Sequence, residues 1–409
     1  MSSSHQVNRD WRFKRFLPES IGLILACANL TCACRTADVP PRDSTGVERP
    51  QQVADDSENV LSPKLIESAT TALLRMQEDD GAWPYEGVYR LHGAIPIGYR
   101  AGGTSCVATA LLYAGRGRED VDRAIDRALR FILAVLDEDG LSMSRRDKYD
   151  VRIWGQSAAL SFLSQWLLVT QPDESNESLR KAARRAAESL AERIIAQEIK
   201  SGGWNYANQR YAASFVTGPV VQSLLWARAA GVSVPDELLV RSGATLKGLA
   251  RSDGAVHYTG VSLVVSYFKP GTTIPGSAAR APVCATTLLL LGLNSQGDVR
   301  AALDVFFENW QVLEDRRKKT GTHEGPDGVA PYYFFFGHRY AAQAISTLPE
   351  ADRVRYRKRL RSLLLRVQDE DGTWNDRVFA RSRNYGTAMA LLALLGDEVP
   401  LPPGLTVSR

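Results

Sequence analysis

The sequence predicts an all-α fold, an α6/α6 toroid with two concentric rings of helices, on three observations. Two kinds of helix pattern alternate along the chain, a turn motif with the spacing Gln-x3-Gly-x-Trp recurs between them, and strand patterns are scarce. An amphipathic helix buries one stripe, whereas a helix that is apolar all round must be buried on most sides. Six alternations therefore predict polar-faced helices outside and apolar helices inside, over residues 61–400.

The elements follow in pairs along the chain. The charged, amphipathic stretches expected to form the outer ring are 62–77, 119–136, 178–198, 236–251, 298–313 and 351–368. The stretches rich in Ala, Leu, Gly and Thr, expected to form the inner ring, are 104–115, 154–169, 214–230, 283–294, 337–348 and 385–396. The sixth pair should meet the first and close the ring.

The turn motif has a physical basis. Its clearest copies are 77–83 and 368–374, a diverged copy is 197–204, and weaker copies lie at 137–140, 252–258 and 327–332. Glycine adopts a positive φ, the Gln amide can pair with unsatisfied groups at a helix end, and the Trp covers the contact with a large apolar face. The acidic residues before the glycine recur with the turn, so we interpret them as scaffold rather than as catalytic carboxylates.

The N-terminus predicts export. A basic segment, an apolar stretch at 21–30 and small residues indicate a signal peptide over 1–34. Cys27, in Ile-Leu-Ala-Cys, matches a lipoprotein signal, Cys34 is a second lipidation candidate, and ordinary cleavage stays open. Residues 35–60 predict a flexible linker and 401–409 a C-terminal tail. The expected location is the cell envelope, lipid-anchored to a bacterial membrane and facing the periplasm or exterior.

Composition excludes several classes. The 409 residues are 44% apolar and 23% charged, which is ordinary for a globular chain and excludes a disordered or collagen-like one. A net charge of +4 argues against a dedicated nucleic-acid binder, which needs a concentrated basic stripe. No apolar run approaches the roughly 18 residues of a membrane-spanning helix, which excludes a multi-pass membrane protein.

The Gln-x3-Gly-x-Trp turn after a Leu-rich helix resembles the QW motif of squalene and oxidosqualene cyclases. The helix-pair repeat is similar to that of protein prenyltransferase β subunits. The resemblance covers about 61–400 and implies the toroid. It also implies a cyclase acid, Asp-x-Asp-Asp-Thr-Ala, at an inner helix start. The best match, 213–218, keeps Thr217 but has Ala213, Phe215 and Val216 in place of the aspartates.

The prenyltransferase resemblance implies a zinc site that this chain does not keep. The family holds zinc with Asp-x-Cys on one inner helix and a His on the last. The matching positions here are Pro282, Cys284 and Gly386. One thiolate cannot make a tetrahedral zinc site, so we expect no metal and no cofactor.

The candidate ligand site is the mouth where the inner-helix N-termini should converge. These positions are rich in aromatic and basic residues, which suit an apolar or sugar face and an anion; the alternatives are core packing and salt bridges to the turn acids. The candidates are Arg100, Arg152, Trp154, Trp204, Tyr206, His257, Tyr258, Tyr332, Tyr333, His338, Arg339, Arg383 and Tyr385.

The first functional hypothesis is an exported toroid that binds an apolar, isoprenoid or peptide ligand without the family chemistry. The second is a diverged terpenoid cyclase or prenyl-group enzyme. The third is an enzyme like the polysaccharide lyases, with His257 and Tyr258 as base and acid and rim arginines neutralising a uronate. No nucleic-acid partner is expected, the membrane is contacted only through the leader, and the oligomeric state is left open.

Overall fold

The computed structural model describes residues 62–90, 93–138, 140–141, 151–206, 210–260 and 273–405. All of them belong to one compact unit, 55–409. The predicted signal segment 1–34, with Cys27 and Cys34, and the linker 35–60 lie outside the described residues, as does the end of the tail. Within the described ranges every helix is too short or too polar to span a bilayer.

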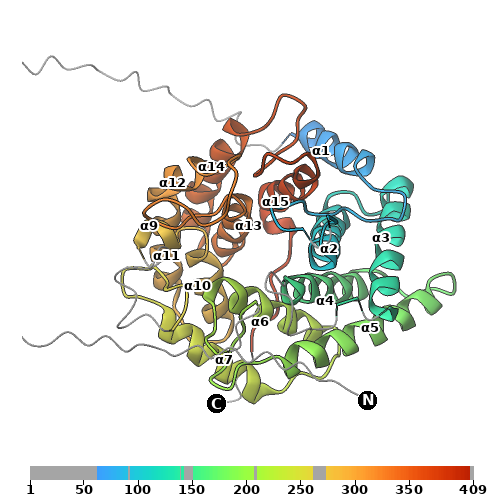
Figure 1. Cartoon of the computed structure of the whole chain (residues 1–409), viewed down its shortest axis with the longest axis horizontal. Helices are drawn as coiled ribbons and strands as arrows, with labels where there is room; N and C mark the ends of the chain where they lie inside the picture. The colour runs from blue at the N-terminus through green and yellow to red at the C-terminus, as the bar shows by residue number, and fades with distance from the viewer. Residues whose placement is uncertain are drawn as a thin grey trace, which may run out of the picture. The chain divides into compact units, whose positions relative to one another are not determined.

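The predicted toroid is confirmed: in the part of the chain that the structure describes, the helices form an outer and an inner ring (Figure 1). The outer helices are α1 (Pro63–Arg75), α3 (Glu119–Asp137), α5 (Glu177–Ala196), α7 (Asp236–Leu249), α11 (Gln296–Glu308) and α14 (Glu350–Arg366). The inner helices are α2 (Ile97–Ala114), α4 (Arg152–Val169), α6 (Ser214–Ala229), α10 (Ala281–Leu290), α13 (Tyr333–Ser346) and α15 (Arg383–Leu395). Short helices α9 (Ile274–Ser277), α12 (Trp310–Glu314), η3 (Ala380–Ser382) and η4 (Gly396–Glu398) lie in the connections.

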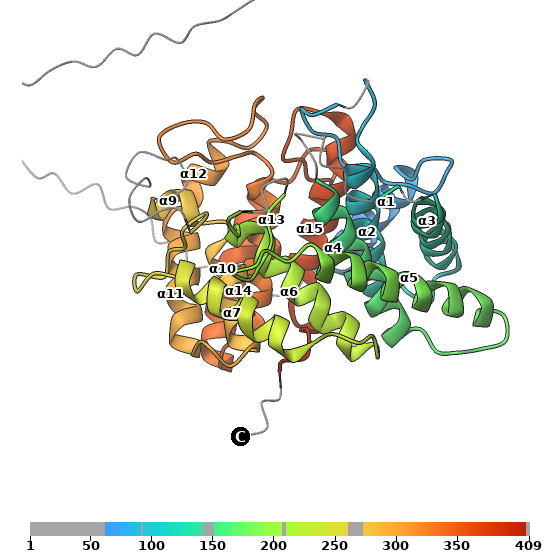
Figure 2. The same ribbon diagram turned by 60° about the horizontal axis from the view of Figure 1, so that its bottom comes forward.

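The layers follow from which residues are buried. Helix α3 buries one stripe and exposes its charged face, whereas most of α2, α4, α6 and α15 is buried. The turned view of Figure 2 keeps α13, α15 and α2 central, with α11 and α3 on either side. The described residues form isolated β-bridges but no strand.

Two inner helices begin four or more residues earlier than the sequence predicts. Helix α2 starts at Ile97 rather than 104, because the glycines that weaken its helical pattern allow close contacts. A Cβ on Gly98 would lie 2.9 Å from the Val151 backbone, and one on Gly103 would lie 2.4 Å from the Trp83 carbonyl oxygen. Helix α13 starts at Tyr333 rather than 337, so the run of aromatic residues 332–336 lies at its N-terminus.

The turn motif joins the end of an outer helix to the start of an inner one. In the two clearest copies and in the diverged copy, the buried indole donates to a carbonyl ten residues earlier. The pairs are Trp83 to Leu73, Trp374 to Leu364 and Trp204 to Ile194. The backbone N–H of the same tryptophans donates to a threonine of the next inner helix, Thr104, Thr217 or Thr387. Both N–H groups of each buried tryptophan therefore have a hydrogen-bond acceptor.

The last helix pair closes the ring on the first. Helix α15 packs against α2. The Asn384 side-chain amide donates to the Pro84 carbonyl at 3.0 Å, across 300 residues of sequence. Cys106 on α2 and Cys284 on α10 are both free thiols.

Candidate functional site

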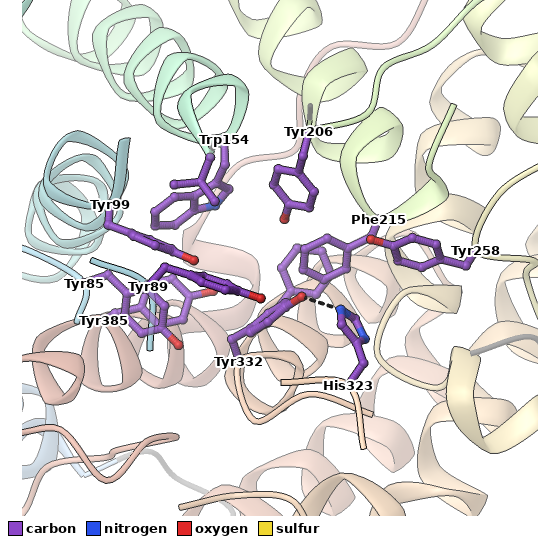
Figure 3. A pocket seen from close by; sticks show the side chains of 12 residues that line it. Tyr85, Tyr89, Tyr99, Trp154, Tyr206, Phe215, Tyr258, His323, Tyr332 and Tyr385 are labelled. Carbon is purple, nitrogen blue, oxygen red and sulfur yellow. Dashed lines mark hydrogen bonds between the residues drawn. The ribbon is translucent and has the colours of Figure 1, made fainter. Parts of the chain in front are cut away.

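An aromatic pocket lies at the N-terminal ends of the inner helices, with about 790 Å³ of space not occupied by protein atoms (Figure 3). Its walls come from the inner helices and from the turns that precede them. We call it the aromatic pocket; it is lined by Tyr85, Tyr89, Tyr99, Val151, Trp154, Tyr206, Phe215, Tyr258, His323, Tyr332, Phe336 and Tyr385.

The rings of the aromatic pocket support one another. On one side Tyr85 lies against Tyr385, with ring centroids 4.5 Å apart, and Trp154 lies 6.0 Å from Tyr385. On the other, Phe215 lies 4.3 Å from Phe336. Burial raises the pKa of the tyrosines at 85, 99, 206, 258, 332 and 385. These hydroxyls therefore stay protonated, so the pocket offers apolar faces together with neutral donors and acceptors.

One hydrogen-bonded pair in the pocket can move a proton. The Tyr332 hydroxyl lies 3.0 Å from His323 Nε2, and His323 Nδ1 lies 2.9 Å from the Gly328 carbonyl oxygen (Figure 3). A carbonyl only accepts, so Nδ1 carries the ring hydrogen and Nε2 accepts from Tyr332. Burial lowers the pKa of His323, and the charges of Arg280 and Arg377 lower it further. The ring is therefore neutral at pH 7 and free to take a proton.

Two buried arginines lie behind the pocket wall. Arg280 donates to the carbonyls of Val256 and Gly276, and its guanidinium lies 5.6 Å from the Tyr258 ring centroid. Arg377 lies 5.3 Å from the Tyr332 ring centroid. Charges in a low-dielectric interior act over such distances, so these two residues give this side of the pocket a positive potential.

A buried carboxyl also lies next to the pocket, and the sequence interpretation missed it. Asp376 is fully buried, and one oxygen accepts from the Tyr85 hydroxyl at 3.0 Å; the other has no partner in the described structure. Burial raises the pKa of Asp376 to about 7, against the opposing effect of Arg377. Arg377 Nε also donates to the Tyr85 hydroxyl, at 3.2 Å, so this hydroxyl connects the two groups.

A sequence signal for Asp376 exists. In the sixth repeat the residue two places after the motif tryptophan is Asp376, whereas Tyr85 and Tyr206 hold that place in the first and third. Only a comparison of the copies separates this acid from the solvated ones before the glycine. At the inner-helix starts, where the sequence places the candidate site, no described acid is buried.

Five of the thirteen residues predicted at the mouth line the aromatic pocket: Trp154, Tyr206, Tyr258, Tyr332 and Tyr385. Tyr333 lies directly behind them, with its ring 4.8 Å from Phe215. Tyr332 and Phe336 line the pocket, while Tyr333, Phe334 and Phe335 pack in the core. The run 332–336 therefore contributes both to a ligand-binding face and to core packing.

The predicted rim arginines have other surroundings. Arg100 pairs with Glu78 and Asp80, and Arg383 pairs with Asp371, which is the salt-bridge alternative to ligand binding. Arg152 begins α4 outside the pocket lining. Arg339 lines a second cavity instead.

The remaining three candidates do not line the pocket. Trp204 is buried within the turn motif. His338 is buried in the core, where Nε2 accepts from the Trp310 indole at 2.8 Å and burial lowers its pKa to about 4. His257 is half-buried next to Tyr258 but outside the pocket lining. Consecutive positions before a helix point in different directions, so spacing alone could not separate these residues from the true lining.

The potential metal ligands are scattered. In the part of the chain that the structure describes, no three His, Cys, Asp or Glu side chains gather as a metal site would require. Cys284 is fully buried, and its thiol donates to the Ser214 carbonyl at 3.6 Å. Burial raises the pKa of this thiol to about 12, so it is not a thiolate at neutral pH.

No family model matches the chain, and no curated protein matches its sequence. Solved structures do match. The unsaturated glucuronyl hydrolase of Bacillus sp. GL1 has a TM-score of 0.56 at 15% identity, over 85% of this chain and 100% of that one. The α-1,6-mannanase of Salegentibacter sp. HEL1_6 has 0.52 at 14%, over 81% and 98%. This chain is an α/α toroid.

At these identities the toroid's neighbours show the fold alone. A type II terpene cyclase from Scytonema also matches, with a TM-score of 0.44 at 14% identity over 82% of this chain and 97% of that one. That likeness carries no argument. The matches support the α/α-toroid fold and do not confirm the finer resemblance to terpenoid cyclases.

Proposed function

We propose that this toroid is a carbohydrate-active enzyme that binds an acidic saccharide in the aromatic pocket and cleaves it by elimination, as polysaccharide lyases do. The observation that carries the proposal is the Tyr332–His323 hydrogen bond inside a pocket lined by aromatic rings. The proposal keeps the chemistry of the third sequence hypothesis but replaces His257 and Tyr258 as the acting pair, because His257 does not line the pocket.

The pocket suits a sugar better than a hydrocarbon. Seven of its twelve lining residues are tyrosines. Their ring faces can cover the apolar face of a pyranose, while their hydroxyls can pair with the sugar hydroxyls. The positive potential from Arg280 and Arg377 favours a saccharide that carries a carboxylate. Two carbohydrate-active proteins among the solved toroids support the same class of substrate.

The pair can supply both proton transfers of an elimination. The Tyr332 oxygen takes the hydrogen from the carbon next to the uronate carboxylate while its own proton passes to His323 Nε2. A carbon–carbon double bond forms and the adjacent carbon–oxygen bond to the leaving sugar breaks. The leaving oxygen then takes a proton back from Tyr332, and His323 returns its proton to the tyrosine. No other reactant is needed.

The test is elimination on a panel of uronate polysaccharides, followed by the ultraviolet absorbance of the new conjugated double bond. We expect activity in the full chain and a loss of at least about 100-fold in Tyr332→Phe and His323→Gln. Because the pKa of His323 is lowered, the rate should already be on its plateau at neutral pH and fall only at more acidic pH.

Two further variants make this test specific. Tyr356→Phe removes a hydroxyl that donates to Asp304 in the outer layer, and it should keep activity. His257→Gln distinguishes the Tyr332–His323 pair from the His257–Tyr258 pair of the third sequence hypothesis, and it should also keep activity. An inactive wild-type chain on every uronate, or full activity in Tyr332→Phe, would contradict the proposal.

A terpenoid cyclase is the second candidate, and Asp376 is the observation that favours it. Protonation of an alkene needs a protonated carboxylic acid next to a dry, aromatic pocket. Asp376 has a raised pKa and lies behind Tyr85, which lines the pocket. The carboxyl does not itself line the pocket, so this candidate ranks second. Incubation of the same proteins with squalene and farnesyl diphosphate shows whether cyclic products form.

Export and lipid anchoring belong to the same proposal and rest on the leader sequence alone. A toroid attached to the outside of a cell would meet extracellular polysaccharides directly, whereas isoprenoid diphosphates are intracellular compounds. The location therefore agrees better with a saccharide than with the isoprenoid ligand of the first hypothesis.

A further inference from the structure

A second cavity lies among the inner helices, with about 690 Å³ of space not occupied by protein atoms. We call it the lower chamber. Trp154, Phe336 and Tyr385 line both cavities, so these three rings separate the lower chamber from the aromatic pocket. Its other lining residues come from α2, α4, α6, α13 and α15, largely from positions further along these helices.

The lower chamber is polar although the helices around it are largely apolar. Serine, threonine and glutamine side chains from α2, α4, α6 and α13 line it. Several of them are committed to nearby groups: Gln165 donates to Ser161, and Gln222 donates to Thr287. Glutamines at the centre of a helical protein are costly unless they have partners. A polar lining at this place therefore indicates a polar occupant.

Arg339 is the one charged residue among the described residues that line the lower chamber. Its contact within the described structure is the ring of Tyr340, 6.0 Å from the guanidinium carbon. No described carboxylate pairs with it or lines the chamber. Burial lowers the pKa of Arg339, but an arginine side chain keeps its charge in proteins. The chamber therefore contains a cation that no described residue neutralises.

The titratable groups around Arg339 do not supply the missing negative charge. Burial raises the pKa of the Cys106 thiol and of the Tyr113 hydroxyl to about 12, and it raises that of Tyr340 as well. All three groups are neutral at pH 7. Arg339 therefore lacks a described counter-ion, and an anionic ligand in the chamber can supply one.

A second unpartnered side chain lies beside Arg339. Gln343 follows one helical turn later on α13 and is 4% exposed, and its amide oxygen is buried without a hydrogen-bond partner. Residues four apart lie on the same face of a helix, so the amide and the guanidinium face the chamber together. A guanidinium that donates and an unused amide oxygen that accepts suit an oxyanion that also carries a hydroxyl group.

We propose that the lower chamber binds a small oxyanion that also carries a hydroxyl group, a hydroxycarboxylate or a protonated phosphate, at Arg339 and Gln343. The guanidinium supplies the charge and two parallel N–H donors, and the Gln343 amide oxygen accepts from the hydroxyl of the ligand. The site is separate from the aromatic pocket and does not depend on the proposed lyase activity. It accounts for the polarity of the chamber and for the absence of a described counter-ion.

The test measures binding of inorganic phosphate and of malate to the purified chain by isothermal titration, with chloride holding the ionic strength constant. We expect one site for at least one of the two anions. Arg339→Met should weaken binding at least tenfold, and Arg339→Lys should fall between the two because it keeps the charge but loses the planar donor pair. The preferred anion identifies the source of the oxyanion.

Thermal unfolding keeps the test informative. In chloride alone, Arg339→Met should melt at the same temperature as the wild type or higher, because it removes an uncompensated charge. Addition of the bound anion should raise the melting temperature of the wild type only. Arg123→Met, on the exposed face of α3, should respond as the wild type does. No binding of either anion, or equal binding by Arg339→Met, would overturn the proposal.

Discussion

Asp376 shows how one side chain takes its properties from its surroundings. Its pKa is about 7 in the folded chain against an ordinary value of 3.8, because burial penalises the carboxylate. The folded state therefore binds more protons than the unfolded state between about pH 4 and pH 7. The stability that this carboxyl contributes is fully present below its unfolded pKa and is lost as the pH rises through its folded pKa.

We expect the unfolding free energy of the wild type to fall by about 2 kcal/mol more than that of Asp376→Asn between pH 5 and pH 8. Urea denaturation at the two pH values measures the difference. Asp371→Asn is the control, because hydrogen bonds from Thr373 lower the pKa of Asp371 and its contribution is lost only at more acidic pH. Parallel pH profiles of the wild type and Asp376→Asn would show that Asp376 titrates normally.

At this scale the sequence predicts the type of site but not its membership. Trp154 and Tyr385 were found because they lie at inner-helix starts. His323 is outside the predicted set because it lies in the loop before α13 and not at a predicted helix start, and in the structure its ring meets Tyr332. His338 and Arg339 are neighbours in the chain but point to different surroundings, since successive helical residues are about 100° apart.

At the scale of the elements, the alternation of helix patterns was enough to predict all twelve helices of the two rings. The spacing of apolar residues reports which face of a helix is buried, and burial separates the two rings. The ends of the helices were less predictable where a close tertiary contact, and not the helix propensity of the residues, decides the boundary. The glycines of α2 lie inside the helix because neighbouring backbone leaves no room for a Cβ, which no local pattern reveals.

Gly81, in the first copy of the turn motif, and Gly117, between α2 and α3, are a matched pair of glycines. Gly81 and Gly117 have φ of 90° and 92°, but a Cβ on Gly81 would lie 2.6 Å from the Arg127 carbonyl oxygen, whereas one on Gly117 would meet nothing within 4 Å. Gly117→Ala should cost about 1 kcal/mol from backbone strain alone. Gly81→Ala should cost at least about 2 kcal/mol more, because α1 and α3 must separate.

Chemical denaturation of both variants measures this difference. The two variants are compared by their denaturation midpoints, provided that both keep the wild-type m-value. A changed m-value would report on the compactness of the unfolded state and not on the turn. Equal destabilisation by the two substitutions would mean that the contact between this turn and α3 is not needed for the ring.

At the scale of the whole molecule, the inner ring encloses two cavities that share part of their walls. Inner-helix N-termini and their turns build the aromatic pocket, and later turns of the same helices build the lower chamber. Trp154, Phe336 and Tyr385 come from three different helices, so the wall between the compartments exists only when the ring is closed. Closure therefore couples the geometry of both sites to contacts between the two ends of the described chain.

Asn384 tests that coupling. Its amide donates to the Pro84 carbonyl across the junction of the first and sixth pairs, and the side chain is 2% exposed. Asn384→Ala leaves this buried carbonyl without its donor, so we expect a loss of about 1–3 kcal/mol. Because the bond joins the ends of the described chain, amide hydrogen exchange should accelerate both in α15 and around 83–103.

Asn294→Ala is the control for this last substitution, since the Asn294 side chain accepts from Lys247 at the exposed surface. It should leave exchange at 83–103 unchanged. If Asn384→Ala accelerates exchange in α15 alone, the first pair holds its place without the sixth, and the wall between the two compartments does not depend on ring closure. Acceleration at both ends together means that the toroid opens at this junction, which would expose the aromatic pocket and the lower chamber in one step.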